Sequence, residues 1–218
     1  PAFTQINCQS EEDKLKFESL GLVNTINTGN LKFAVTLKDF SKIDLRTQWS
    51  LHKDDFVVVF GSSRPGEEEL IFQSISILNS GIDRLKIIIV PRHLNRIEEV
   101  YKLGKNHNVK LLSEINHSES FSTLIVDKMG VLTELYALSD ISIIGGSFYD
   151  FGGHNPLEPA YYGKPIIMGE YHSSCRQSVE LLNKENAILV SNKSNLVMDI
   201  INLANDTSLR KKMGSNAK

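Results

Sequence analysis

The sequence contains little of what several classes of protein require. Its two cysteines, Cys8 and Cys175, lie far apart, which excludes a disulfide framework and a cysteine metal site and favours two small buried thiols. No apolar run approaches the roughly 20 residues of a membrane-spanning helix. Because the net charge is only −2, nothing in the composition indicates a nucleic-acid partner. These absences leave an ordinary globular protein.

Several catalytic and cofactor motifs are missing as well. The six histidines are scattered, and none stands in an HExxH arrangement, so no metal site is predicted. The sequence has no GxSxG elbow of a hydrolase and no GxGxxG fingerprint after its first strand. The loop GSSRPGEEE, at 61–69, lacks the spacing of a Walker loop. We therefore expect neither a metal nor a dinucleotide cofactor.

What is present is a regular alternation of two patterns. Short, nearly continuous apolar runs predict strands at 56–60, 86–90, 109–112, 123–126, 141–144, 165–168 and 187–190. Such runs are typical of parallel strands buried on both faces. Amphipathic segments predict helices at 66–79, 94–105, 130–138, 156–163, 174–183, 194–204 and 207–216. The alternation predicts an α/β fold with a Rossmann-like, doubly wound parallel sheet and right-handed crossovers.

The start of the chain has a different pattern. Residues 3–7 are compatible with a strand, and 10–21 with a helix that Ser10 caps, Asp13 supports as a capping box and Gly21 ends. TGNLKF, at 28–33, predicts a turn, and the polar stretch 38–54 is expected to link this start to the main domain. The chain begins at Pro1 without an initiator methionine, so we expect a fragment of a longer protein.

The loops that follow four of the strands should share one edge of the sheet, where ligands bind in such folds. The longest of them, GGSFYDFGGHNPLEP, has glycines that allow sharp turns and close approach to a ligand. Asn155 is the expected N-cap of a helix, with Pro156 in its first turn and free N–H groups for an anion. Glu158 either accepts hydrogen bonds from a ribose diol or complements the helix dipole. His154 is ambiguous, because a lone histidine is often a hydrogen-bonded turn residue.

Two more loops carry candidate ligand groups. Arg92, in PRH, follows a buried strand and either pairs with a phosphate, stacks on a base or is an ordinary surface arginine. Ser62 and Ser63 offer hydroxyl and backbone donors before a helix. The three glutamates at 67–69 are most simply first-turn acids that complement the dipole of that helix.

Together these motifs resemble the bacterial 3-deoxy-D-manno-octulosonic acid (Kdo) transferases. The resemblance rests on GGSF…GGHNPLEPA, PRH, the SSxxGEEE-type loop, DKMGVLTELYALSD and TGNLKF, and it covers almost the whole chain. It implies the C-terminal half of a GT-B glycosyltransferase. Residues 1–36 would be the tail of the N-terminal GT-B domain and a linker, and 37–218 the C-terminal nucleotide-sugar-binding, Rossmann-like domain.

The resemblance also implies a function. The full-length protein would transfer Kdo from CMP-Kdo to a lipid A precursor in lipopolysaccharide core biosynthesis, with inversion and without a metal or other cofactor. The base would be a glutamate in the N-terminal half, so this chain would hold no catalytic residue and would be inactive alone. The surfaces for the acceptor and for the inner membrane would lie in that half too. The expected location is the bacterial cytoplasm, at the cytoplasmic face of the inner membrane.

The resemblance assigns donor contacts residue by residue. The positions that it assigns are Ser62, Ser63, Arg92, Met129, Gly130, Gly146, Asn155 and Glu158. Arg92 would meet the cytidine, and Met129 with Gly130 would line the base pocket. Many members read MGEL where this chain has MGVL, so Val131 replaces an acid and no side-chain contact is expected there.

The remaining assignments concern the phosphate and the sugars. Asn155 would lie by the phosphate or the ribose, Glu158 would bind the ribose hydroxyls, and Ser62 or Ser63 would face the phosphate or the Kdo carboxylate. Two alternatives stay open. One is a GT-B domain that binds another nucleotide sugar, as in an epimerase-like hydrolase, and the other is a nucleotide-binding module without chemistry.

Overall fold

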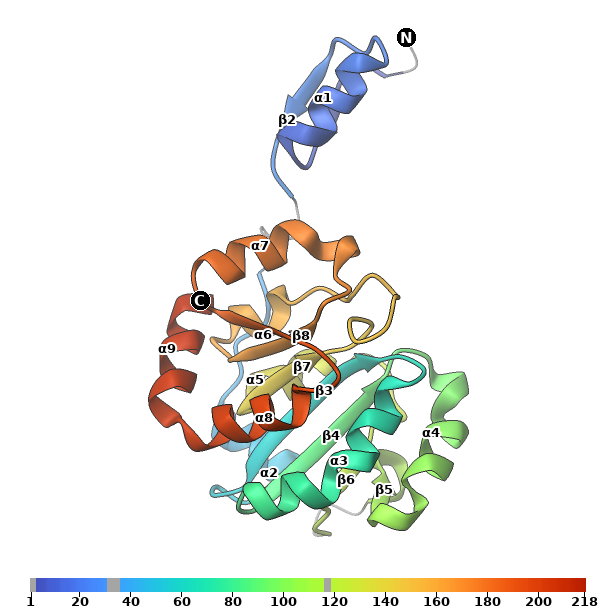
Figure 1. Ribbon diagram of the computed structural model, residues 1–218, viewed down its shortest axis with the longest axis vertical. Helices are drawn as coiled ribbons and strands as arrows, with labels where there is room; N and C mark the ends of the chain where they lie inside the picture. Colours follow the sequence, from blue (N-terminus) through green and yellow to red (C-terminus); the bar gives the residue numbers. More distant parts are fainter. Residues whose placement is uncertain (1–2, 31–35, 116–118) are drawn as a thin grey trace. The chain divides into compact units, whose positions relative to one another are not determined.

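The computed structural model describes the chain except for residues 1–2, 31–35 and 116–118. It divides into two compact units, Pro1–Lys38 and Asp39–Lys218 (Figure 1). The sequence placed the corresponding boundary after residue 36, and the assignment of the first unit to a preceding GT-B domain stays a prediction. Of the turn expected at 28–33, residues 31–33 lie outside the described residues.

The first unit is a small βαβ element. Strand β1 (Ile6–Cys8) pairs in parallel with β2 (Thr25–Asn27), and helix α1 (Glu11–Ser19) connects them. The predicted N-cap is confirmed, because the Ser10 hydroxyl oxygen accepts the N–H of Asp13 at 3.0 Å. The predicted stop is confirmed as well, since Gly21 follows the helix with a φ of +82°. No residue of α1 is buried.

The second unit contains one sheet of seven parallel strands in the order β5-β6-β4-β3-β7-β8-β9. Their bounds are β3 (Phe56–Ser63), β4 (Leu85–Pro91), β5 (Val109–Leu111), β6 (Thr123–Ile125), β7 (Ile141–Ile144), β8 (Ile166–Gly169) and β9 (Ile188–Ser191). All of the strands predicted for this unit are therefore confirmed. The chain builds outward from β3 through β4 to one edge and then through β7 to the other. The point where the strand order reverses lies between β3 and β7.

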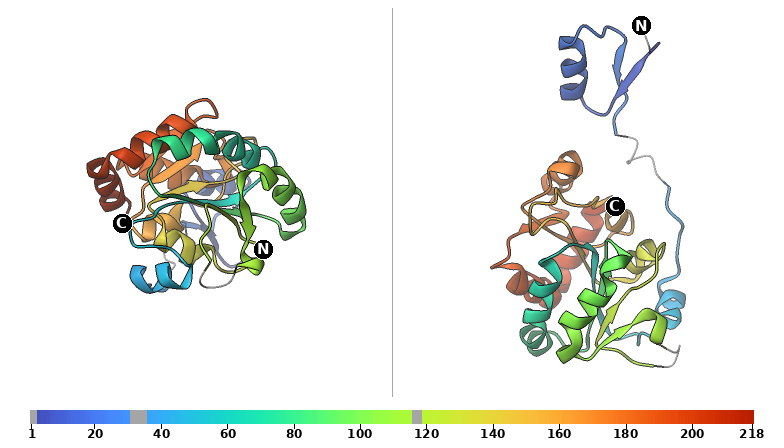
Figure 2. Two further views of the ribbon diagram at one scale, coloured as in Figure 1. Left: turned by 90° about the horizontal axis from the view of Figure 1, so that it is seen from below. Right: turned by 90° about the vertical axis from the view of Figure 1, so that its right-hand side faces the viewer.

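Helices cover both faces of this sheet (Figure 2). One face carries α2 (Lys42–Gln48), α5 (Leu132–Leu138), α6 (Leu157–Tyr161) and α7 (Arg176–Lys184). The other carries α3 (Glu67–Gly81), α4 (Ile97–Gly104), α8 (Leu196–Asn205) and α9 (Thr207–Ala217). The three-layer, doubly wound fold predicted from the alternation of patterns is confirmed.

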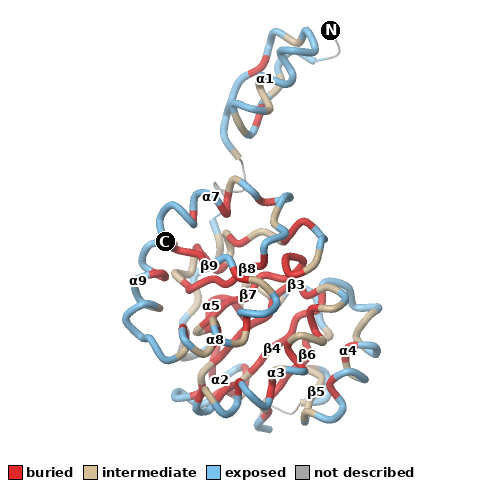
Figure 3. Tube along the Cα trace, in the orientation of Figure 1, coloured by how far each residue is buried: buried red, intermediate tan, exposed pale blue. Residues whose placement is uncertain are grey.

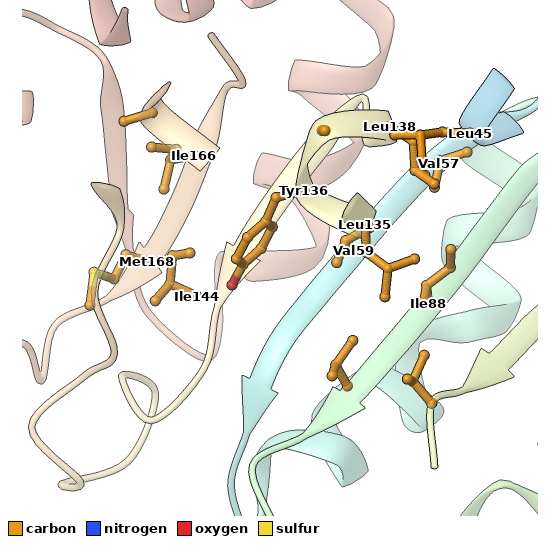
Figure 4. Packing of buried hydrophobic residues seen from close by; sticks show 14 of the residues in the cluster. Leu45, Val57, Val59, Ile88, Leu135, Tyr136, Leu138, Ile144, Ile166 and Met168 are labelled. Carbon is orange, nitrogen blue, oxygen red and sulfur yellow. The ribbon is translucent and has the colours of Figure 1, made fainter. Parts of the chain in front are cut away.

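The core consists of two apolar layers with the sheet between them. Along β3, Val57 and Val59 pack against one layer, and Val58 and Phe60 against the other. Successive side chains of a strand point to opposite faces, so a strand that is covered on both sides reads as an unbroken apolar run. Figure 3 shows the strands of this sheet as its buried part, and Figure 4 shows the packing of the layer that includes Leu135 and Leu138.

Helix α2 was missed in the stretch expected to be a polar link. Its anchor is Arg46, whose guanidinium is buried, donates to the carbonyls of His52 and Asp55, and pairs with Asp140 at 2.7 Å. Leu45 is buried beside it in the core. The local signals for this helix are few: the Ser41 hydroxyl accepts the Asp44 N–H at 3.4 Å, and Leu45 and Trp49, four residues apart, are buried.

Candidate functional site at the carboxyl edge of the sheet

The loops after β3 and β7 meet at the point where the strand order reverses, which is the usual place for a ligand in a doubly wound sheet. The N–H of Gly145 donates to the carbonyl of Gly61 at 2.8 Å. A Cβ on Gly145 would lie 2.4 Å from the carbonyl oxygen of Ser62, so only glycine fits there. Ser62 itself has a φ of +58°, next to an irregularity in the pairing of β3. Such a conformation is costly for a residue with a side chain and is typical of functional loops.

Glu67, the first residue of α3, holds these two loops together. Its side chain is fully buried. The carboxylate accepts four backbone N–H groups at 2.7 to 2.9 Å, those of Arg64, Gly146, Ser147 and Phe148. Burial raises the pKa of this carboxyl, and the N–H groups act against that rise. We call residues 145–156, between β7 and α6, the glycine loop. The interpretation of Glu67 as a simple first-turn acid was therefore incomplete, because the residue ties the β3–α3 loop to the glycine loop.

Glu68 is also fully buried and turns one of the predicted ligand residues inward. It accepts the hydroxyl of Ser63 at 2.8 Å and pairs with the guanidinium of Arg96 at 2.8 Å. The Ser63 side chain is thus committed to the interior, with no exposed surface. Ser62 keeps a small exposed fraction of 9% at the same edge.

Four basic side chains, which we call the basic cluster, gather above the glycine loop: Arg64, Arg92, His93 and His154. Nη1 of Arg64 lies 2.6 Å from Nε2 of His93, and its guanidinium lies over the ring of Phe151. Burial and then the charges of Arg92, Arg64 and His93 lower the pKa of His154 to about 4. The predicted Arg92 is exposed, and its N–H donates to the carbonyl of Ser63. It thus lies at the reversal point, beside Arg64 and His154, which the sequence did not single out as ligands.

The start of α6 differs from the expectation. The helix begins at Leu157 with Pro156 as its cap, although the side-chain oxygen of Asn155 still accepts the Leu157 N–H at 3.3 Å. The helix has only five residues, so it is too short for a substantial dipole. The N–H groups of Gly153 and His154 donate to backbone carbonyls. Neither of these two N–H groups is therefore free for an anion, and the expected anion site at the start of this helix stays a prediction.

Glu158 lies in the first turn of α6. It is half-buried and accepts the hydroxyl of Thr133 at 3.0 Å. Burial and then the Glu158 charge raise the pKa of Tyr136, a buried residue labelled in Figure 4. A Cβ on Gly61 would lie 2.0 Å from the Tyr136 hydroxyl, which places that hydroxyl against the end of β3. Glu158 thus lies near the reversal point, behind the glycine loop.

The residues expected to line a base pocket lie at the surface. Met129 is 60% exposed, and Gly130 has a φ of +84° with open space around it. A cavity of about 510 Å³ lies next to them, and its lining includes Asp127, Lys128 and Val131. Met129 and Gly130 are not among its lining residues. Ser62, Arg92, Gly146, Asn155 and Glu158 are thus grouped near the reversal point, whereas Ser63 faces inward.

The described residues provide neither a metal cluster nor a membrane-spanning helix. Outside the ranges 1–2, 31–35 and 116–118, no three His, Cys, Asp or Glu side chains are grouped so that they could hold a metal ion. In that same part of the chain, every helix is too short or too polar to cross a membrane. Cys8 and Cys175 are both buried free thiols, as expected.

No protein-family model matches the chain. It is 35% identical over 217 residues to a bifunctional glycosyltransferase/methyltransferase of Fusobacterium nucleatum, with 95% of the chain and 33% of that protein covered. It is 33% identical over 202 residues to the 3-deoxy-D-manno-octulosonic acid transferase of Aquifex aeolicus, with 92% of the chain and 54% of that protein covered. The chain thus spans about half or less of the length of these relatives.

A solved structure agrees with these relatives. The crystal structure of the C-terminal CMP-Kdo binding domain of WaaA from Acinetobacter baumannii matches with a TM-score of 0.72 and 29% identity, over 81% of this chain and 93% of that one. Sequence and fold therefore lead to the same relatives. The chain is homologous to the C-terminal part of the 3-deoxy-D-manno-octulosonic acid transferases and has the fold of one half of a GT-B glycosyltransferase.

Proposed function

We propose that this chain is the donor-binding domain of a Kdo transferase and that its ligand is CMP-Kdo. The observation that carries the proposal is the position of the glycine loop after β7. Glu67 accepts its N–H groups, its Gly145 packs against Ser62, and the basic cluster lies beside it. A ligand with a phosphodiester and a carboxylate fits a site whose exposed groups are basic. The similar WaaA domain of Acinetobacter baumannii is a CMP-Kdo binding domain, which supports this choice of nucleotide sugar.

Side chains rather than backbone N–H groups would hold the phosphate. Glu67 already occupies the N–H groups of Gly146, Ser147 and Phe148. We therefore assign the phosphate to Arg64, with Ser62 and Asn155 at its edge. This extends the assignment from the sequence, in which Arg64 had no role.

The cytosine and the ribose of the nucleoside would have separate contacts beside this phosphate. Arg92 would meet the cytosine, with Met129 and Gly130 at the rim of its pocket. Glu158 would accept the ribose hydroxyls, because its carboxylate has one hydroxyl partner, Thr133, and two oxygens to offer.

In the full-length protein we propose transfer of Kdo from CMP-Kdo to a lipid A precursor at the cytoplasmic face of the inner membrane. The base, the acceptor site and the membrane-associating surface would belong to an N-terminal half. Residues 1–36 would be the end of that half and a linker. The absence of any buried residue in α1 supports this assignment, since such a helix needs a partner to cover its apolar side chains.

The first test is nucleotide selectivity. We expect the purified chain to bind CMP weakly, because half of the cleft is missing, and to bind it at least about tenfold more tightly than UMP or AMP. Calorimetry or ligand-observed NMR measures the three affinities. Equal binding of all three, or tighter binding of UMP, would favour the alternative of a domain for another nucleotide sugar. No binding of any of them would contradict a donor site.

A further inference from the structure

Two buried nitrogen atoms without a hydrogen-bond partner belong to side chains that both border Gly146 in the glycine loop. They are Nε of Arg64 and Nε2 of His154, two of five such buried side-chain atoms in the described part of the chain. A Cβ built on Gly146 would lie 3.2 Å from Nε2 of His154 and 3.6 Å from Cγ of Arg64, so both side chains border the same small space. Buried polar atoms are rarely left unpaired. Nε of Arg64 can only donate and so lacks an acceptor, and Nε2 of His154 would also need an acceptor once the ring is protonated.

The surroundings of the imidazole are basic. Three groups act on it electrostatically, and they are Arg92 and His93 after β4 and Arg64 after β3. The Cys175 thiol donates to the His154 carbonyl oxygen at 3.3 Å. Arg64 has no lone pair to offer, so its contact at 2.6 Å requires Nε2 of His93 to accept. His93 is thus already engaged, whereas Nε2 of His154 is not.

This arrangement opposes a proton on His154 while the site is empty. Burial and the basic neighbours together lower the pKa of the imidazole to about 4, so it is neutral near pH 7. A negative charge placed among the same groups would favour the protonated form of His154, because it offsets the repulsion from the basic neighbours and accepts a hydrogen bond from the protonated ring. The carboxylate of Glu67 does not serve this purpose, because its oxygens accept four backbone N–H groups on the other side of the loop.

We propose that His154 takes up a proton from solvent when an anionic ligand enters the basic cluster, and that it then donates from Nε2 to that ligand. The proposal rests on the proposed function, in which the anion is the phosphodiester of the donor. It adds that donor binding is linked to pH through a residue of the GGHNP turn. Histidine is suited to this role because its ordinary pKa, near 6.5, lies within the physiological range.

The sign of the effect follows from linkage. Between the low pKa of His154 in the free protein and the higher value in the complex, the complex binds more protons than the free protein. Affinity must therefore rise as the pH falls through that interval, by at most about tenfold per pH unit for one proton. Above the interval the affinity is independent of pH.

The probe is the 5′-methyl phosphodiester of cytidine, because a phosphodiester keeps one negative charge throughout the range, whereas the monoester CMP titrates near neutrality. Calorimetry from pH 5.5 to pH 8, in buffers of different ionisation enthalpy, measures the affinity and the number of protons taken up. We expect the affinity to rise at least about threefold toward pH 5.5, with net proton uptake. His154→Gln should bind with an affinity that does not depend on pH and with no uptake.

His93→Gln is the matched control, because it removes an exposed imidazole from the same cluster. It should keep the proton uptake. Proton uptake that persists in His154→Gln, or that disappears only in His93→Gln, would overturn the proposal. So would a wild-type affinity that does not change with pH. Thermal unfolding checks that each variant is folded.

A second measurement separates this proposal from the proposed function. NMR of the imidazole C–H signals gives the pKa of His154 in the free protein and in the presence of sulfate, which is fully ionised in this range. We expect sulfate to raise that pKa, and an unchanged value would overturn the inference. If the cytidine ester failed to bind at every pH, the proposed donor would be wrong, and the sulfate titration would still decide the role of His154.

Discussion

Glu67 and Glu158 are carboxylates near the same reversal point, but their surroundings give them different roles. Glu67 is fully buried, and its two oxygens are occupied by four N–H groups. Glu158 is half-buried and accepts the hydroxyl of Thr133. A satisfied, inaccessible carboxylate fixes a structure, whereas a partly accessible one with spare lone pairs is able to bind a diol.

For Glu158→Gln we expect CMP affinity to fall at least tenfold, because a charge-assisted hydrogen bond contributes about 1.5–3 kcal/mol. The melting temperature should barely change, since a first-turn dipole interaction contributes only about 0.3–1 kcal/mol. Calorimetry and thermal unfolding measure the two quantities. Glu180→Gln, on the exposed side of α7, is the control and should change neither. A lower melting temperature with unchanged affinity would mean that Glu158 is only a structural helix acid.

At the level of single residues, the sequence located the ends of the strands better than the buried contacts behind them. Arg92 follows β4 and Ser62 lies near the end of β3, so their position at the edge comes directly from the strand pattern. Glu67 could not be found in this way, because its partners in the glycine loop are 79 to 81 residues away in sequence. The inward turn of Ser63 depends on Glu68, which is near in sequence, and on Arg96, which pairs with Glu68 across 28 residues.

Among the elements, the sequence predicted those in which apolar residues form a clear and sufficiently long pattern. The strands of the large sheet are covered on both faces, so each leaves an unbroken apolar run. Helix α2 leaves no comparable pattern, because it is held mainly by the buried guanidinium of Arg46. Helix α6 is too short for its cap to be located from sequence, and its first residue is one position later than expected.

The contact between Glu67 of α3 and the glycine loop after β7 gives a prediction about these two elements. For Glu67→Gln we expect the free energy of unfolding to fall by at least about 2 kcal/mol, because an amide N–H₂ would face N–H donors and leave them unpaired. Nucleotide affinity should fall as well, since the glycine loop is no longer fixed. Urea unfolding at pH 7 and calorimetry with CMP measure both.

The control for this joint is Glu98→Gln, which changes an exposed first-turn glutamate of α4. It should alter the free energy of unfolding by no more than about 0.5 kcal/mol. If Glu67→Gln proved as harmless as this control, Glu67 would be only a dipole-complementing acid, as the sequence first suggested.

For the whole molecule, the fold class followed from the sequence because the alternation of patterns is a property of the entire chain. The activity does not follow in the same way. The chain spans 33% and 54% of the two relatives described above, and the second unit contains one sheet with an apolar core layer on each face. A GT-B enzyme places its reacting atoms between two such domains. The groups described here are therefore proposed to bind the donor, and none of them is assigned as the catalytic base.

We therefore expect the 218-residue chain to bind CMP but to transfer no Kdo. Catalysis at the anomeric carbon requires a base within hydrogen-bond reach of the acceptor hydroxyl. The three carboxylates described near the reversal point are assigned elsewhere, Glu67 to the loops, Glu68 to Ser63 and Arg96, and Glu158 to the ribose. The assay is transfer from CMP-Kdo to a lipid A precursor, with the full-length Aquifex aeolicus transferase as the positive control. Turnover by the chain alone would show that a base lies within residues 1–218, and the roles of Glu67 and Glu158 would then have to be reassigned.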